Sequence, residues 1–224
     1  MRQLLVLLFV FSQINSAIGQ HKDSSFEYLG REFPNGTFSK SNSKVKGSRY
    51  INSTFQKIKF LDQEDGKFSG KYNAYHDLIE VITKTGKKYF SPSTAYPYSV
   101  VFLGTNKVYR AFSTSTKKSA FFRIVFADKK IALLTKERII LTQEVLPQSG
   151  YDTYKPPAFK RLKDVHYLKY SSKDIVEELP KRKSKFFKIF DKNSTSVKNY
   201  VKKEKLNTKD EADLIKIFKY ASTL

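Results

Sequence analysis

The sequence predicts an α+β protein in which an N-terminal antiparallel β-meander domain is followed by a short C-terminal helical segment. Three observations lead to this class. From Phe55 to Val145, short runs of strand-like residues with period-two alternation recur. Residues suited to tight turns separate these runs, and the apolar spacing becomes helical beyond Pro180. No helical pattern lies between the expected strands, which excludes a parallel doubly wound sheet.

The first residues have the three parts of a secretory signal peptide. A positive start at Met1-Arg2 precedes an apolar run from Leu4 to Phe11, and Ala17 to Gly19 supplies small residues at the cleavage site. The apolar run is too short to cross a membrane, which takes about 20 residues. We therefore expect cleavage before Gln20 and an exported protein, periplasmic or extracellular, that does not span a membrane. The chain has no Cys, so neither a disulfide nor a Cys-linked lipid is expected.

Three parts follow from this reading: a signal peptide at 1–19, an antiparallel β domain at 20–172 and a basic helical C-terminal segment at 173–224. Within the β domain, alternation predicts these strands: Leu78 to Thr83, Tyr98 to Leu103, Val108 to Phe112, Phe121 to Phe126, Ile131 to Leu134 and Arg138 to Val145. Turns are expected at Asp65-Gly66, Lys84 to Lys87, Gly104 to Asn106 and Asp128 to Lys130.

After the meander, the prolines and glycine between Pro147 and Pro157 predict an irregular connector. A last strand pair is expected around Lys160 to Tyr170. Helical spacing then predicts a short helix from about Ser184 and a second around Val197 to Val201. Thr208 and Glu211 form a capping-box pattern, which predicts that the final helix starts there with each side chain bonding the other's backbone amide.

The charge is strongly positive, with 42 Lys and Arg against 21 acidic residues and a formal net charge of +21. The most basic window, Lys181 to Lys205, holds ten cations and two acids. Candidate polyanion contacts within it are Lys181, Arg182, Lys183, Lys185, Lys188, Lys202 and Lys203. Two interpretations stay open here, a selected polyanion surface and a solvated helix face in a Lys-rich composition. Only eight cations are Arg, which disfavours specific phosphate recognition.

The usual catalytic and cofactor motifs are absent from the sequence. Three well-separated His residues and no Cys make a zinc site improbable, so we expect no metal. Gly86-Lys87 lies in a turn rather than before a helix, and no G-x-S-x-G run occurs, so no cofactor or serine nucleophile is expected. Carboxylates at Asp77, Glu80 and Glu144 leave a glycan hydrolase as an alternative, although Asp77 and Glu80, three apart on a strand, would point to opposite faces.

One stretch combines aromatic, amide and carboxylate side chains in a strand and turn, and its members are candidate ligand contacts: Tyr72, Asn73, Tyr75, His76, Asp77 and Glu80. The competing interpretation is structural. In it, Asn73 and Asp77 shape the turn while Tyr72 and Tyr75 pack.

The stretch Tyr72 to Glu80, together with Pro157-Ala158-Phe159 and the Tyr200 to Leu206 helix, resembles a family of exported Bacteroidota (Flavobacteria-like) proteins of unknown function. The resemblance spans nearly the whole mature chain and departs from the family pattern at Lys219-Tyr220 and in the polar stretch Ser39 to Ser53. It implies an exported bacterial protein and brings no catalytic residue.

Together these features predict an exported, non-enzymatic envelope protein, a binding or structural module with a basic surface. The alternative is an envelope hydrolase acting on glycans or other polymers. Expected partners are envelope polyanions or another envelope protein. Nucleic acid is not expected, because the chain is predicted to be exported and has no recognised nucleic-acid-binding motif.

Overall fold

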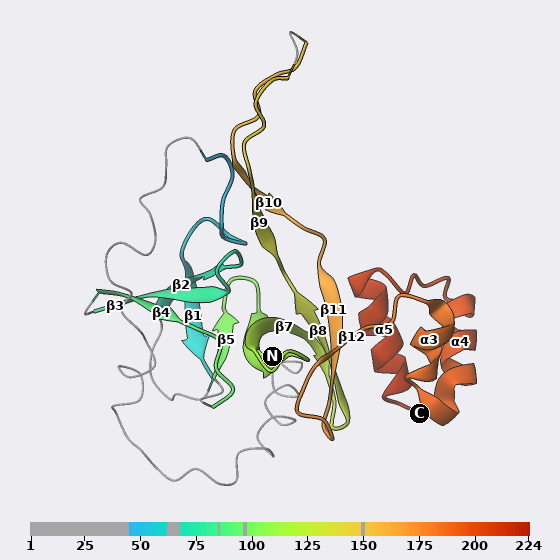
Figure 1. Ribbon diagram of the computed structural model, residues 1–224. Coiled ribbons are helices and arrows are strands. Elements are labelled where there is room, and N and C mark those ends of the chain that lie inside the picture. The colour runs from blue at the N-terminus through green and yellow to red at the C-terminus, as the bar shows by residue number, and fades with distance from the viewer. Residues whose placement is uncertain (1–44, 62–67, 85, 96–97, 149–150) are drawn as a thin grey trace.

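The computed structural model describes residues 45–61, 68–84, 86–95, 98–148 and 151–224. The predicted α+β class is confirmed: a ten-stranded antiparallel sheet is followed by short C-terminal helices (Figure 1). The predicted signal peptide and the Asp65-Gly66 turn lie outside the described residues. Within the described part of the chain, no helix has both the length and the apolar character needed to cross a membrane.

The sheet has the order β12-β11-β8-β7-β6-β5-β1-β2-β3-β4. Its strands are β1 (Gln56–Phe60), β2 (Phe68–Asn73), β3 (Leu78–Thr83), β4 (Gly86–Phe90), β5 (Ser99–Phe102), β6 (Lys107–Ser113), β7 (Ser119–Ala127), β8 (Ile131–Lys136), β11 (Val165–Tyr170) and β12 (Glu177–Glu178). A separate two-stranded sheet pairs β9 (Ile139–Thr142) with β10 (Ala158–Arg161).

The predicted turns at Gly104 to Asn106 and Asp128 to Lys130 join β5 to β6 and β7 to β8. Between β7 and β8, Asp128 Oδ1 accepts hydrogen bonds from the amides of Lys130 (2.7 Å) and Ile131 (2.8 Å), a local pattern typical of Asp in turns. Asn106, between β5 and β6, has φ 53°, which Asn adopts more readily than most residues. Each of these turns returns the chain antiparallel to the strand it has just left.

Alternation along the strands divides the sheet's side chains between two faces. On one face, Tyr109, Ala111 and Phe121 join residues of β1–β5 in an apolar cluster. On the other, Val108, Phe122 and Leu134 form a second cluster with Val176. A bulge in β7 between Ile124 and Phe126 shifts this alternation, and Val125 and Phe126 both pack against the helix-covered cluster described next.

The C-terminal helices are α3 (Lys183–Lys188), the 3₁₀ helix η1 (Asp191–Asn193), α4 (Ser194–Lys203) and α5 (Glu211–Ala221). They cover the sheet at its β7, β8 and β11 end (Figure 1). Leu133 and Leu168 of the sheet share a core with Leu214, Ile217 and Phe218 of α5. The helical segment is therefore packed on the sheet through a common core.

The predicted start of the final helix was wrong in detail. The N-cap is Asp210, whose side chain accepts a hydrogen bond from the amide of Asp213 at 3.1 Å, while Thr208 is buried. Asp is as good an N-cap as any residue. The Glu211 side chain does not reach back to a backbone amide; it bonds the guanidinium of Arg123, a charge-assisted contact stronger than a neutral one.

Residues 139–148 and 151–161, together called the arm below, form a hairpin that projects from the body (Figure 1). Beyond β9 and β10 its two strands pair again at Val145 and Lys155, which exchange two backbone hydrogen bonds (2.8 and 3.0 Å). The predicted connector over Pro147 to Pro157 is thus the outer part of this hairpin. The two strands expected around Lys160 to Tyr170 are present as β10 and β11, but they do not pair with each other, because β10 pairs with β9 and β11 pairs with β8.

Candidate functional site

The stretch Tyr72 to Glu80 is the turn between β2 and β3 with the strand ends that flank it. Asn73 Oδ1 accepts a hydrogen bond from the backbone amide of His76 at 3.1 Å, which stabilises the turn. Asp77 has φ 57°, a left-handed conformation that Asp tolerates better than bulkier residues. The local chemistry of Asn and Asp therefore determines how this hairpin turns.

Asp77 lies at the centre of a partly buried polar network. Its Oδ1 accepts a hydrogen bond from Tyr72 Oη at 2.6 Å and pairs with Lys136 Nζ at 2.7 Å, while its Oδ2 accepts from the Phe121 amide at 3.2 Å. Lys136 Nζ also donates to the Phe121 carbonyl at 2.8 Å. One carboxylate thus ties the β2–β3 turn to β7 and β8.

The environment of this network shifts the pKa of two of its members. Burial, reinforced by the charge of Asp77, raises the pKa of the Tyr72 phenol well above its usual value. Burial lowers the pKa of Lys136, and the attraction of Asp77 opposes that change. Tyr72 stays neutral at physiological pH, so it acts as a hydrogen-bond donor to Asp77.

Glu80 belongs to a second network, separate from that of Asp77. Its Oε1 accepts hydrogen bonds from Tyr50 Oη at 2.7 Å and Asn73 Nδ2 at 3.5 Å, and Lys71 Nζ lies 4.0 Å from its Oε2. Lys71 also lies 3.7 Å from the centre of the Tyr50 ring, a cation–π contact. Burial, followed by the hydrogen bond to Glu80, raises the pKa of Tyr50.

The six candidate ligand contacts are thus brought into one turn: Tyr72 and Asp77 belong to the first network, Asn73 and Glu80 to the second, and the side chains of Tyr75 and His76 to neither. Tyr75, at 38% exposed, is the large hydrophobic residue among them that faces solvent. Its ring meets those of Phe159 and His76 edge-on, with ring centres 5.2 and 4.6 Å apart. Tyr75 also lines a cavity of about 670 Å³ at the base of the arm, together with Leu141, Glu144 and Tyr154. Tyr154 Oη donates to Glu144 there at 3.0 Å.

Glu137, just after β8, forms a network that the sequence analysis missed. Its side chain is fully buried, accepts a short hydrogen bond from Tyr109 Oη, and pairs with Lys107 (3.1 Å), Arg161 (3.2 Å) and Arg123 (3.7 Å). Burial acts to raise its pKa, but the hydrogen bond from Tyr109 and the charges of Lys107 and Arg123 outweigh it, so the pKa lies below its usual value. Glu137 is therefore ionised at physiological pH.

Arg123 extends this network to the C-terminal helices. Its Nη2 donates to both carboxylate oxygens of Glu211, at 2.7 and 3.0 Å, and Glu211 also accepts from Thr135 Oγ1 at 2.8 Å. The Thr135 hydroxyl lies 2.9 Å from His166 Nδ1. By strand parity Arg123, Thr135 and Glu137 share one face of the sheet, and they lie between its first apolar cluster and the helix-covered one. That parity is the signal from which their inward orientation could have been predicted.

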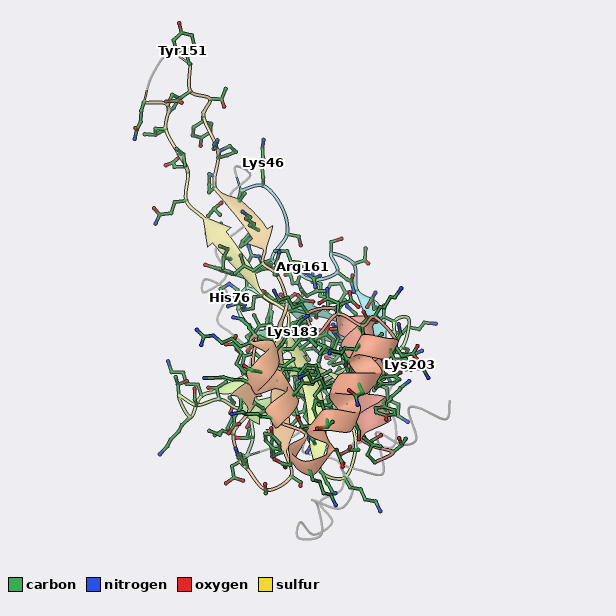
Figure 2. All side chains as sticks on the ribbon, turned by 90° about the vertical axis from the view of Figure 1, so that its right-hand side faces the viewer. Lys46, His76, Tyr151, Arg161, Lys183 and Lys203 are labelled. Atoms are coloured by element: carbon green, nitrogen blue, oxygen red, sulfur yellow. The ribbon has the colours of Figure 1, made fainter. Side chains whose placement is uncertain are left out.

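The ten cations between Lys181 and Lys205 are all exposed. Among the described residues, Lys181 is the one of them with an ion pair, to Glu178 at 2.7 Å. The predicted contacts Lys181, Arg182, Lys183, Lys185, Lys188, Lys202 and Lys203 therefore form part of a charged, solvent-facing surface over α3 and α4. Figure 2 shows Lys183 and Lys203 on opposite sides of these helices.

Two further results concern sites and relatives. In the described ranges no group of three or more His, Asp and Glu side chains could hold a metal ion. Comparisons with protein families, with curated proteins and with solved structures give no match to this chain.

Proposed function

We propose that the chain is an exported, non-enzymatic module of the bacterial cell envelope that holds anionic polymers on the lysine-rich surface of its C-terminal helices. The observation that carries the proposal is the accumulation of exposed cations on α3 and α4. Nearly all of them lack an acidic partner in the described part of the chain. In a protein of net charge +21, these side chains keep their full charge available to an external anion.

The packing beneath the cations supports a surface of fixed shape. Phe186, Val197 and Val201 face the core shared with the sheet, so the lysines between them must face solvent. The Arg123–Glu211 contact holds α5 on the sheet as well. A polymer would therefore bind cations whose backbone positions are already fixed on two helices. Cations on an unordered segment would have to be ordered on binding, which would cost binding free energy.

Most of these cations are lysines, and lysine lacks the planar group with which arginine recognises a phosphate in one geometry. Binding should therefore depend on the density of charge on the polymer. Sulfated, phosphorylated or carboxylated envelope polymers share the required chemistry. The hydrolase alternative has no comparable support among the described residues, because Asp77 and Glu80 are already bonded to partly buried neighbours and Glu144 accepts from Tyr154.

The test compares two variants that lose the same charge at different places. The first replaces Lys185, Lys188, Lys198 and Lys202 with Gln on the helices. The matched control replaces Lys57, Lys59, Lys84 and Lys87, which are exposed on β1 and around the β3–β4 turn.

Affinity for a soluble sulfated polymer is measured between about 50 and 200 mM salt, where counterion release makes charge-driven binding fall steeply. We expect the helix variant to lower the slope of log affinity against log salt by on the order of one unit per contacted lysine, and the control to change it little. An equal fall in this slope in the two variants would show that net charge alone drives binding, and would contradict the proposal that the polymer binds to the C-terminal helices.

A further inference from the structure

The arm carries most of the large apolar side chains that the described chain exposes. Of ten such residues, six lie on the arm: Ile140, Leu141, Val145, Leu146, Tyr151 and Tyr154. Their exposed fractions run from 40% for Ile140 to 100% for Tyr151. In Figure 2 Tyr151 lies at the far end of the arm, well away from the body and from Lys183 and Lys203.

The exposed apolar area on the arm is large for a monomer. With on the order of 200 Å² for a fully exposed side chain of this size, the six residues expose about 700 Å² in each copy. Single surface patches on monomers rarely exceed a few hundred Å², whereas a stable interface buries about 800 Å² on each partner. Because neighbouring residues such as Ile140 and Leu141 point to opposite faces of β9, this area is divided between the two faces of the hairpin, and a partner that runs alongside the arm can contact both.

The charge of the arm indicates which partner it suits. From Ile139 to Arg161 the charged residues are Glu144, Asp152, Lys155, Lys160 and Arg161, a net charge of only +1 in a chain of +21. Two copies meeting through their helices would bring like charges together, but two arms do not repel each other in this way. An anionic membrane is less suitable, because the outer part of the arm carries Glu144 and Asp152 against Lys155 alone, while the densest cations lie on the helices at the other end of the molecule.

The backbone of the arm has one open edge. The outer edge of β10 is covered at the arm's base, where the Lys46 amide donates to the Pro157 carbonyl at 3.0 Å and the Phe159 amide donates to the Lys46 carbonyl at 2.8 Å. Pro156 and Pro157 also lie on that side of the hairpin and lack amide donors. β9 pairs with β10 alone among the described strands, so its outer edge can accept a further strand.

We propose that the arm is a self-association surface: two copies pair their β9 edges antiparallel, which makes a four-stranded ribbon and brings the exposed apolar side chains of the two arms into contact on each of its faces. An antiparallel pair of identical edges has two-fold symmetry, so the same contacts form on both copies and the assembly closes as a dimer. The arrangement keeps the two helical segments apart at the ends of the assembly.

The first test is sedimentation equilibrium of the whole chain at about 10 µM, with dimers expected at twice the mass of the monomer and a Kd at or below that concentration. Leu146→Ser with Tyr151→Ser removes two exposed side chains, so the fold is kept, and should weaken dimerisation at least roughly 30-fold. The matched control is Ile82→Ser, which removes an equally apolar residue, 44% exposed, from β3, and should leave the dimer unchanged.

The second test uses the absence of Cys from the chain. Single Cys residues are placed at Leu141, Gln143 and Val145, with Ile82 as the control. Two β9 edges related by a two-fold axis bring one position of each copy within disulfide range, a Cα separation of about 4.4–6.8 Å. We expect strong disulfide dimer formation at one arm position under mild oxidation and none at Ile82.

Three results would overturn the proposal. If the protein is monomeric at every concentration tested and does not bind vesicles, the arm is not a self-association surface. A monomer that floats with phospholipid vesicles, and loses flotation in the Tyr151→Ser variant, would make the arm a lipid anchor. A dimer that survives the arm substitutions would locate the interface elsewhere.

Discussion

Replacing Glu137 with Gln removes the one charge on which three cations and a tyrosine converge. Two of the cations can adapt to its loss: the side chains of Lys107 and Arg161 are 30% and 46% exposed and can turn toward solvent. Arg123 is 11% exposed and Tyr109 is 3% exposed, so neither side chain can turn toward solvent. Because the Gln carbonyl can still accept from Tyr109, most of the cost falls on Arg123, whose Nε has no hydrogen-bond partner.

Breaking a buried pair by removing one partner costs about 3–5 kcal/mol. Since Arg123 Nη2 keeps its hydrogen bonds to both carboxylate oxygens of Glu211, we expect a cost at the lower end of this range, about 3 kcal/mol. For a domain of this size that corresponds to a fall in Tm of roughly 6–12 °C. The assay is urea unfolding followed by circular dichroism, with calorimetry for Tm.

Glu144→Gln is the matched control, because Glu144 is exposed on the arm, and a surface change of this kind stays within about 0.5 kcal/mol. A loss below about 1 kcal/mol for Glu137→Gln, with an unchanged m-value, would refute the reasoning. It would mean that the free energy cost of desolvating the Glu137 carboxylate is as large as the stabilisation from its ion pairs and hydrogen bond.

Two further predictions concern charge. Glu137 and Glu211 both have pKa values below their usual 4.5 in the folded state, so the unfolded chain takes up protons first as the pH falls. The stabilisation that these two carboxylates provide is complete above about pH 4.5 and is lost as the pH falls below that value. Urea unfolding midpoints measured from about pH 7 to about pH 3 test this. A midpoint that stayed constant or rose below about pH 4.5 would contradict it. Asp77→Asn should destabilise the fold by about 2 kcal/mol, because Lys136 loses its charge partner. The double variant with Lys136→Met should recover about half of that loss or more, and strictly additive losses would show that the two residues are not coupled.

The strands could be predicted because their signal is local. Leu78 to Thr83 was predicted as a strand with the bounds that β3 has, since apolar alternation and turn-forming residues at both ends agree. The helices near Ser184 and Val197 followed likewise from apolar spacing. In these segments each residue's own preference and its place in the fold point the same way.

The arm and the buried networks could not be predicted, because they depend on pairing between distant parts of the chain. Pro156 and Pro157 marked an irregular segment correctly, but nothing local indicates that the strands on either side pair with each other. Glu137 is separated from Tyr109 by 28 residues and Arg123 from Glu211 by 88. The capping-box prediction failed for the same reason, because a guanidinium from β7 takes the carboxylate that the local pattern assigned to the helix end.

α5 follows every strand of the sheet in the sequence, and this order has a consequence for biosynthesis. Leu214, Ile217 and Phe218 complete the core over Leu133 and Leu168, and they are synthesised after all the strands that they cover. A nascent chain therefore exposes this apolar surface of the sheet until α5 has been made. Chains truncated before Leu214 should therefore be prone to aggregation and rapidly degraded, even though they contain every strand of the sheet.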